Sequence, residues 1–484
     1  MVGVVCAHVA AAAALRNAIF PPAVSVRVVQ SSANLGQRLT PLPALQFSTQ
    51  TPRGVAVIHV DDTVRYQNIT GFGAAMTDSS AWIMQTRLTA PVRAALYDSM
   101  FGPSGINMTM LRVPMGATDF TVGGKPYSYD DQPRGRTDPG LNGFTIAHDL
   151  PYVIPALRQA LARNPHISML ANPWSPPGWM KTNGALDNNY HQGALLHAQL
   201  GALASYFVKF IQAYARAGVP ISALTPQNEP GNPTAYPGME FPAPREGKWI
   251  RGNLLPALAA AKLHPKIYGN DQGWSQQGSD YVRQLRSNIS SSQLSGIAWH
   301  CYFGSPDVMG ALHAAAPQVE QTVDECSPGI LPFPVSEVMI SSLRNWASSV
   351  VLFNLALDTR GGPAQVPNHG CGGCTGLAKV DSRADSFTLM RSFYELGQVS
   401  KFIRPGAQRI KTENFVSYRY TRPAENFYSP GLDNVAARNR DGSIVVVAYN
   451  NGRRPISFAV QWRGRSFGYT LAPGSTVTFS WRGG

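Results

Sequence analysis

A short apolar run followed by an amphipathic segment recurs eight times between residues 55 and 400, and this repeat constrains the fold most strongly. Each run is strand-like and ends in polar or Gly/Pro-rich residues. Strands that alternate with helices along a chain build parallel sheets, and eight such units close into a barrel. The runs are 69–78, 108–115, 167–174, 219–224, 266–271, 296–302, 322–325 and 349–357.

Helical periodicity fills the stretches between these runs. The clearest case is Leu195 to Ala217, where apolar residues stand three and four positions apart, as on the buried face of a helix. The sequence therefore predicts an α/β fold, a (β/α)₈ TIM barrel with polar residues gathered after its strands. We predict further helices over 92–101, 151–163, 249–262, 281–287 and 385–396.

After residue 400 the pattern changes to short strands, which predict a smaller antiparallel β-sandwich domain. Asp441-Gly442 and Asn450-Asn-Gly452 are typical of hairpin turns. The strand-like stretch Val24–Val29 is expected to add a strand to this sandwich. We predict a barrel over 54–400 and a sandwich made of 24–53 and 401–484, with strands over 416–420, 435–438, 443–449, 456–462, 468–471 and 475–481.

The composition is that of a large folded protein, with 44% hydrophobic and 14% charged residues. No window of about 18 uninterrupted apolar residues appears, so we predict no membrane-spanning helix. The formal charge is +13, and residues 401–484 hold 13 Lys/Arg against 4 Asp/Glu. Such a basic surface is either a solvated face or a peripheral contact with an anionic surface. Motifs of nucleic-acid-binding domains are absent, so we predict no nucleic-acid partner.

Residues 1–23 resemble a signal peptide, with a short disordered arm or a misassigned start as the alternatives. A signal peptide predicts a secreted or extracellular protein. In that setting Cys371 and Cys374 would close a small disulfide loop. Cys301 and Cys326 follow strand-like runs, and we predict that they are buried thiols.

Two glutamates at strand ends point to the chemistry. Glu229 follows the fourth run in Asn228-Glu-Pro230, and Glu325 ends the seventh. A retaining glycosidase needs a nucleophilic carboxylate and a protonated acid about 5–5.5 Å apart. Two strand ends of one barrel can bring carboxylates to that separation, although either residue taken alone would more often form a surface salt bridge.

Other strand-end residues fit sugar binding. Asn228 is placed to donate to a sugar 2-hydroxyl, and His300 and Asp119 to hold other hydroxyls. Arg112 is placed to hold a catalytic carboxylate in its charged form, or alternatively to form an interior ion pair. Aromatic side chains that offer faces for sugar C–H groups, or that simply pack, are Trp174, Trp179, Trp299 and Tyr302.

Motifs for other chemistries are missing. The chain has no Gly-x₄-Gly-Lys-Ser/Thr loop, no Gly-x-Ser-x-Gly elbow and no His-x-x-x-His pair. Hydrolysis by two carboxylates requires no metal and no organic cofactor. We therefore predict neither.

Five stretches together resemble glycoside hydrolase family 30, on the side that contains glucosylceramidase and the β-1,6-glucanases. They are Thr70–Asp78, Leu111–Met115, Asn172–Gly184, Thr225–Pro230 and Tyr394–Ile403. The resemblance implies a barrel with a β-sandwich and hydrolysis with retention of configuration. It implies that Glu229 is the acid/base and Glu325 the nucleophile. It also implies that the sugar is bound, or the carboxylates supported, by Asp119, Trp174, Asn228, His300, Tyr302 and Asn368.

The chain departs from the glucosylceramidase pattern near the substrate pocket. Phe353 stands where that pattern has Trp, Leu352 where it has Asp, and the loop 369–376 differs. Our leading expectation is a glucosylceramidase-like β-glucosidase acting on a carbohydrate or glycolipid. An endo-β-1,6-glucanase or galactanase, and a non-catalytic carbohydrate-binding protein, stay open as alternatives. The aglycone, the exo or endo mode, the oligomeric state and the true N-terminus are not determined by the sequence.

Overall fold

The structure is a computed structural model of the chain. It describes residues 24–187, 193–232, 234–330, 334–364, 371–413, 415–416, 418–420, 426–428 and 431–482. The predicted signal segment, 1–23, lies outside the described residues.

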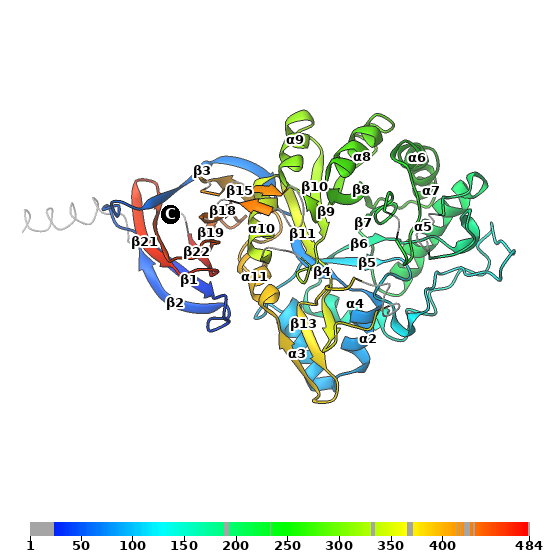
Figure 1. Cartoon of the computed structure of the whole chain (residues 1–484), viewed down its shortest axis with the longest axis horizontal. Helices are drawn as coiled ribbons and strands as arrows, with labels where there is room; N and C mark the ends of the chain where they lie inside the picture. Colours follow the sequence, from blue (N-terminus) through cyan, green and yellow to red (C-terminus); the bar gives the residue numbers. More distant parts are fainter. Residues whose placement is uncertain are drawn as a thin grey trace, which may run out of the picture.

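Eight parallel strands close into a barrel in the larger of the two lobes (Figure 1). The strands follow one another around the barrel in chain order, and the predicted (β/α)₈ barrel is thereby confirmed. They are β4 (Gly71–Ala75), β5 (Met110–Pro114), β6 (Ser168–Asn172), β7 (Ala223–Leu224), β8 (Lys266–Trp274), β9 (Gly296–Gly304), β10 (Glu320–Glu325) and β11 (Ala347–Leu352).

Helices cover the outside of the barrel. In α5 (Leu200–Arg216) the spaced apolar side chains, among them Leu203, Phe207 and Phe210, are buried in the main hydrophobic core, as the periodicity predicts. The other helices between barrel strands are α2 (Asp78–Thr86), α3 (Ala90–Phe101), α4 (Val153–Arg163), α6 (Ala243–Trp249), α7 (Leu255–Ala260), α8 (Gln276–Arg286), α9 (Asp307–Ala315) and α10 (Val335–Arg344).

The expected helix over 385–396 is wrong at its start. Ser386–Leu389 forms strand β14, which pairs with β13 (Ala378–Asp381), and β12 (Ala356–Asp358) completes this three-stranded sheet. Side chains along β14 alternate between exposed and half-buried, which is the two-residue period of a strand and not the spacing of a helix. The helix α11 begins only at Arg391 and runs to Ser400.

The helix α10 was not predicted, although Val338 and Met339 stand three and four positions after Val335 in the sequence. Every residue from Val335 to Leu343 is buried. This helix lies between barrel strand β11 and the sandwich, and α11 also contacts both domains (Figure 1). The two helices therefore pack against the sandwich sheet as part of the main hydrophobic core, which also contains Val435 and Val445.

The smaller lobe is a β-sandwich built from one continuous nine-stranded sheet. Its strand order is β2-β1-β22-β19-β18-β15-β3-β20-β21. The bounds are β1 (Ser25–Ser31), β2 (Thr40–Gln46), β3 (Ala56–Asn68), β15 (Gln408–Lys411), β18 (Leu432–Arg438), β19 (Ser443–Asn450), β20 (Ile456–Trp462), β21 (Arg465–Leu471) and β22 (Thr476–Arg482). A separate pair is formed by β16 (Tyr418–Tyr420) and β17 (Asn426–Tyr428).

The long strand β3 belongs to the sandwich rather than to the barrel. Residues 56–60 pair with β20, and residues from 61 onward pair with β15. The predicted barrel boundary at residue 54 therefore precedes a sandwich strand, and the barrel itself starts at β4. The N-terminal strand β1 pairs with β22 in the same sheet.

One of the two expected hairpin turns is present. Asp441-Gly442 joins the paired strands β18 and β19, with Gly442 at φ 81°. Asn450-Asn-Gly452 joins β19 to β20, and these strands are not paired with each other, so the hairpin prediction is wrong there. Among the described residues, no helix has the length and apolar character needed to cross a membrane.

Candidate active site

The described residues of the predicted site meet at the carboxyl-terminal end of the barrel strands, the face on which such barrels carry their active sites. Asp119 follows β5, Trp174 follows β6, and Glu229 follows β7. His300 lies in β9, and Glu325 is the last residue of β10. Five different strands thus supply one cluster of side chains.

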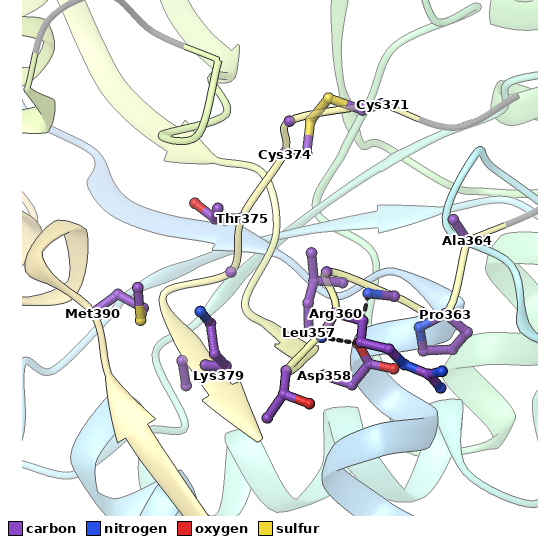
Figure 2. A pocket seen from close by; sticks show the side chains of 17 residues that line it. Leu357, Asp358, Arg360, Pro363, Ala364, Cys371, Cys374, Thr375, Lys379 and Met390 are labelled. Atoms are coloured by element: carbon purple, nitrogen blue, oxygen red, sulfur yellow. Dashed lines mark hydrogen bonds between the residues drawn. A yellow bond between two sulfur atoms is a disulfide. The ribbon is translucent and has the colours of Figure 1, made fainter. Parts of the chain in front are cut away.

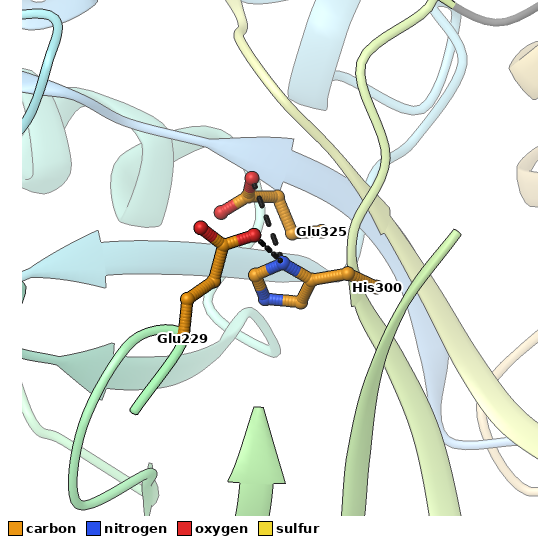
Figure 3. Close-up of side chains that lie close together, drawn as sticks. All are labelled: Glu229, His300 and Glu325. Atoms are coloured by element: carbon orange, nitrogen blue, oxygen red, sulfur yellow. Dashed lines mark hydrogen bonds and ion pairs between the residues drawn. The ribbon is translucent and has the colours of Figure 1, made fainter. Parts of the chain in front are cut away.

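Glu229 and Glu325 face each other, with the imidazole of His300 beside both (Figure 3). One oxygen of each carboxylate lies within 4.8 Å of the other. His300 Nδ1 is 3.1 Å from Oε1 of Glu229 and 3.8 Å from Oε1 of Glu325. Retaining glycosidases hold their carboxylates about 5–5.5 Å apart and inverting ones about 6.5–9.5 Å. The observed spacing fits the retaining arrangement.

Glu229 is fixed by its backbone as well as by its side chain. Its φ of 46° is left-handed, a conformation that costs a non-glycine residue about 1 kcal/mol and clusters at functional sites. Its N–H donates to the carbonyl of Asp271 over 3.0 Å. Its Oε2 accepts hydrogen bonds from Asn232 Nδ2 at 2.6 Å and from the Tyr236 hydroxyl at 3.4 Å.

Two opposing effects set the pKa of Glu229. Burial raises it, but the hydrogen bond and the charge of His300 outweigh burial, so the pKa of Glu229 is lowered. The pKa of His300 is raised well above its usual range. Burial opposes that rise, and the charge of Glu325 and the hydrogen bonds to Asp271 and Glu229 overcome it. Both pKa shifts favour an ion pair between Glu229 and His300 across their 3.1 Å contact.

Glu325 accepts hydrogen bonds from two sides. The guanidinium of Arg112 donates through Nη1 to Oε2, and the hydroxyl of Tyr302 donates to Oε1 over 2.8 Å. Burial and the charge of Glu325 raise the pKa of Tyr302 well above its usual range, so this hydroxyl stays a donor. These contacts fix both oxygens of Glu325 in position.

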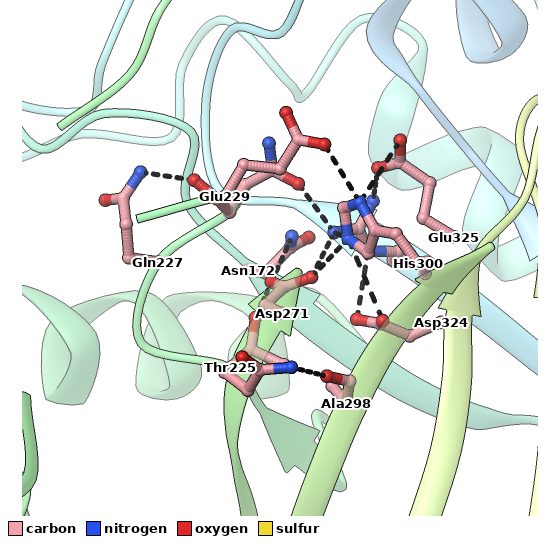
Figure 4. A network of polar contacts seen from close by, with 12 residues as sticks. Asn172, Thr225, Gln227, Glu229, Asp271, Ala298, His300, Asp324 and Glu325 are labelled. Carbon is pink, nitrogen blue, oxygen red and sulfur yellow. Dashed lines mark hydrogen bonds and ion pairs between the residues drawn. The ribbon is translucent and has the colours of Figure 1, made fainter. Parts of the chain in front are cut away.

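Arg112 is fully buried and lies in an ion-pair network. Figure 4 shows its partners Asp271, Asp324 and Glu325. Besides Glu325 it contacts Asn228 Oδ1 at 2.8 Å and Asp271 Oδ1 at 2.9 Å, both through Nη2. Its guanidinium also lies 4.7 Å from the ring centre of Trp174. Burial opposes its charge, but Asp271 and Glu325 keep the pKa of Arg112 above its usual range.

Asp324 adds a third carboxylate to this network. Its Oδ2 is 3.5 Å from Arg112 Nε, and its Oδ1 is 3.9 Å from His300 Nε2. Neither oxygen makes a hydrogen bond within the described part of the chain. Burial and the neighbouring Asp271 raise the pKa of Asp324 well above its usual range. The pKa of Asp271 shifts the other way: burial opposes the shift, but Arg112 and His300 lower it.

Asp119 and Trp174 line the part of the site next to the small sheet. Asp119 accepts a hydrogen bond from the N–H of Cys371 at 3.2 Å, and its pKa is raised to about 8 by burial, then by Glu325 and Glu229. Trp174 stacks against Phe353, with 5.9 Å between ring centres. Trp174 and Phe353 belong to one apolar cluster with Phe120 and Leu357.

A pocket of about 770 Å³ borders this apolar cluster (Figure 2). Its lining includes Asp358, Arg360 and Lys379 from the small sheet and its loops, together with the Cys371–Cys374 loop. The loop also touches Asp119, so it borders both the pocket and the cluster of carboxylates.

The barrel and the sandwich each match a family model. Residues 69–403 match the glycosyl hydrolase family 30 TIM-barrel domain, and residues 406–479 match the glycosyl hydrolase family 30 beta sandwich domain. The chain belongs to glycosyl hydrolase family 30. It is therefore a glycoside hydrolase, and the resemblance expected from the sequence motifs is confirmed.

Named relatives of this family 30 hydrolase act on different glycosides. It is 35% identical over 451 residues to an endo-1,6-beta-D-glucanase of Neurospora crassa, covering 91% of each chain. It is 30% identical over 453 residues to the lysosomal acid glucosylceramidase of Mus musculus, covering 86% of this chain and 82% of that one. A solved endo-beta1,6-glucanase structure is 26% identical, with a TM-score of 0.82, and covers 95% of this chain and 100% of its own.

The prediction that Cys301 and Cys326 are buried thiols is wrong, because the two form a disulfide. Cys301 lies in β9 and Cys326 directly after the neighbouring β10, and their Cα atoms lie 5.4 Å apart, a separation that a disulfide spans. Cys371 and Cys374 form a second disulfide, the small loop expected for an exported protein.

Sequence reasoning missed several residues of the family 30 site. Asp271 ends the fifth predicted strand and was not singled out, although its position after a strand was a usable signal. Asp324, Asn232 and Tyr236 had no such signal.

Two of the aromatic residues predicted as possible sugar contacts lie elsewhere. The indole N–H groups of Trp179 and Trp299 donate to Asp130 and Gln321 inside the core. The predicted Asn368 lies outside the described residues.

Within the described part of the chain, two groups of side chains carry donor atoms that suit a metal ion, namely Glu229, His300 and Glu325, and Asp271, His300 and Asp324. Arg112 already contacts Asp271, Asp324 and Glu325. Its positive charge takes the place that a cation would fill, so this donor set fits an ion-pair network better than a metal centre.

Proposed function

We propose that this family 30 hydrolase is a retaining endo-β-1,6-glucanase in which Glu325 is the nucleophile and Glu229 the acid/base. The observation that carries the proposal is the separation of the two carboxylates, with one oxygen of each within 4.8 Å of the other. Glu325 attacks the anomeric carbon while Glu229 gives its proton to the leaving oxygen. Glu229 then takes a proton from the water that releases the sugar.

His300 supplies Glu229 with the proton that the acid role requires. The lowered pKa of Glu229 and the raised pKa of His300 favour the proton on the imidazole before the reaction. His300 Nε2 also lies 2.7 Å from Oδ1 of Asp271, which holds the ring in place. Transfer of the Nδ1 proton over 3.1 Å leaves a neutral imidazole and a protonated Glu229.

Three relatives support the glucan as substrate. Each is named an endo-1,6-beta-D-glucanase, is 33–35% identical and covers at least 81% of this chain. The departures from the glucosylceramidase pattern point the same way. Phe353 stands where that pattern has Trp. It packs on Trp174 and Phe120 in the apolar cluster. The leading expectation of a glucosylceramidase-like enzyme thus becomes the second candidate, which the mouse relative favours.

The substrate test compares four substrates with purified protein and Glu325→Gln as the matched variant. The substrates are a linear β-1,6-glucan, a β-1,3-glucan, glucosylceramide in detergent and an aryl β-glucoside. We expect the β-1,6-glucan alone among the polymers to be cut, into oligosaccharides of mixed length, and the variant to be inactive. Cleavage of glucosylceramide without glucan cleavage would establish the second candidate. Binding of glucan without cleavage of any substrate would favour a carbohydrate-binding protein.

We propose that the enzyme works outside the cytosol. The two disulfides support this, because disulfides persist in oxidising compartments. Fractionation of the producing cells tests it: we expect activity in the medium or cell wall, and activity confined to the cytosol would contradict the proposal.

A further inference from the structure

The disulfide Cys301–Cys326 joins β9, which carries His300 and Tyr302, to the end of β10, which carries Glu325. Cys301 stands between His300 and Tyr302, which contact Glu229 and Glu325 respectively. Cys326 directly follows Glu325. One covalent bond therefore connects the immediate neighbours of three residues of the site.

The bond lies where the hydrogen-bonded ladder between β9 and β10 ends. Glu320 to Val323 pair in step with Gly296 to Trp299, and then Glu325 pairs with His300, so Asp324 is an extra residue in β10. Such a bulge weakens pairing locally and re-aims the side chain that follows it. The disulfide occupies the next position after Glu325 and His300, beyond the last paired residues.

Polar contacts also join the two strands at this point. The hydroxyl of Tyr302 in β9 donates to Glu325 in β10, and His300 Nδ1 lies 3.8 Å from Oε1 of Glu325. Arg112 contacts both Asp324 and Glu325 at the end of β10. These polar contacts depend on the protonation of their partners, whereas a covalent link between β9 and β10 does not.

We infer that the Cys301–Cys326 disulfide is a positioning crosslink that holds Glu325 against Tyr302 and His300 for attack on the anomeric carbon. The inference rests on the proposed role of Glu325 as nucleophile. Neither cysteine touches the sugar: both side chains are buried, with Cys301 2% and Cys326 0% exposed. The carbonyl of Cys326 also accepts a hydrogen bond from Phe353 N at 2.9 Å, which links the crosslink to the end of β11.

The test measures inactivation by a 2-deoxy-2-fluoro-β-glucosyl fluoride, which traps the nucleophile as a covalent ester. The variant Cys301→Val/Cys326→Ala fills the space of the two thiols with apolar groups and removes the bond. We expect its maximal inactivation rate constant to fall about tenfold or more, since small misplacements of reacting groups cost that much, while the inhibitor concentration for half-maximal rate stays unchanged. Cys301→Ser/Cys326→Ser is the second variant, with the same expectation.

Ile444→Ala, in the core of the sandwich, is the stability-matched control, because it destabilises the protein without touching the site. An inactivation rate within twofold of wild type in a folded cysteine variant, with only a lower Tm, would overturn the inference. If neither variant folds, wild-type protein is reduced stepwise, and loss of inactivation rate must track the appearance of thiols at 301 and 326 with unchanged circular dichroism. Loss of rate only together with loss of structure would overturn the inference. Failure to label wild-type Glu325 at all would instead contradict the proposed function.

Discussion

The hydroxyl of Tyr302 donates a hydrogen bond to Oε1 of Glu325 over 2.8 Å, on the side of the carboxylate opposite to its ion pair with Arg112. The two contacts together hold both oxygens of Glu325 in a fixed orientation. Hydrogen bonds to charged groups contribute about 1.5–3 kcal/mol, which corresponds to a factor of roughly 10–100 in rate when the contact is needed in the transition state.

Tyr302→Phe is therefore expected to lower kcat/KM for the glucan about 10- to 100-fold while the protein stays folded. Removal of the hydroxyl leaves Glu325 with Arg112 as its remaining strong donor. The measurement is steady-state kinetics on β-1,6-gluco-oligosaccharides. Unchanged kcat/KM would mean that the contact does not align the nucleophile.

Glu229→Gln should separate the two steps of the reaction. Loss of general acid catalysis costs about 10²–10⁴-fold, and this loss should appear on the glucan, whose sugar leaving group needs a proton. An aryl glucoside with a nitrophenol leaving group needs no acid, so its first step should stay fast. Added azide should restore turnover of the aryl substrate and yield a β-glucosyl azide. Equal losses on both substrates, without azide rescue, would remove Glu229 from the acid/base role.

Arg112→Met should destabilise the protein strongly, because Asp271, Asp324 and Glu325 lose their shared cation. Removal of one partner from a buried ion pair costs about 3–5 kcal/mol. The measurement is the free energy of unfolding in urea. Arg404→Met is the matched control, since its pair with Asp441 is about half exposed and such pairs contribute less than about 1 kcal/mol. Similar losses in the two variants would contradict the network as described.

Asp119 should make stability depend on pH. Its folded pKa of about 8 lies above the unfolded value, so the folded protein binds an extra proton between about pH 4 and pH 8. The free energy of unfolding should therefore fall as pH rises through this window. Asp119→Asn should flatten the slope and also impair glucan binding.

Glu246→Gln provides the comparison for Asp119. Burial raises the pKa of Glu246 to about 8 as well, but its side chain bonds to Tyr281 outside the carboxylate cluster. This variant should flatten the same slope without changing KM. Unfolding curves that stay parallel to wild type in both variants would contradict the raised pKa values.

The barrel and the two glutamates could be predicted because their signals are local. Each barrel strand is a short apolar run, and Glu229 and Glu325 each stand at the end of one. The strand β3 was misplaced because its residues pair with β15 and β20, which lie far away along the chain. Asp324 was missed because its importance depends on the bulge between β9 and β10, and the disulfide between Cys301 and Cys326 depends on that same register.

The specificity of the site could be predicted only in part. The sequence showed that Phe353 and Leu352 depart from the glucosylceramidase pattern, but not what the change does. In the structure Phe353 packs on Trp174, while Leu352 is buried in the main core. The contact between Asp119 and the N–H of Cys371 joins residues 252 positions apart, and no local pattern predicts such a contact.

The stereochemistry of the product tests the central claim most directly. Proton NMR of a β-1,6-gluco-oligosaccharide during the first minutes of hydrolysis shows which anomer is released before mutarotation mixes them. The two-carboxylate arrangement of Glu229 and Glu325 predicts that the β-anomer appears first, and that Glu325→Gln releases no product. Initial release of the α-anomer, or undiminished hydrolysis by Glu325→Gln, would contradict the account.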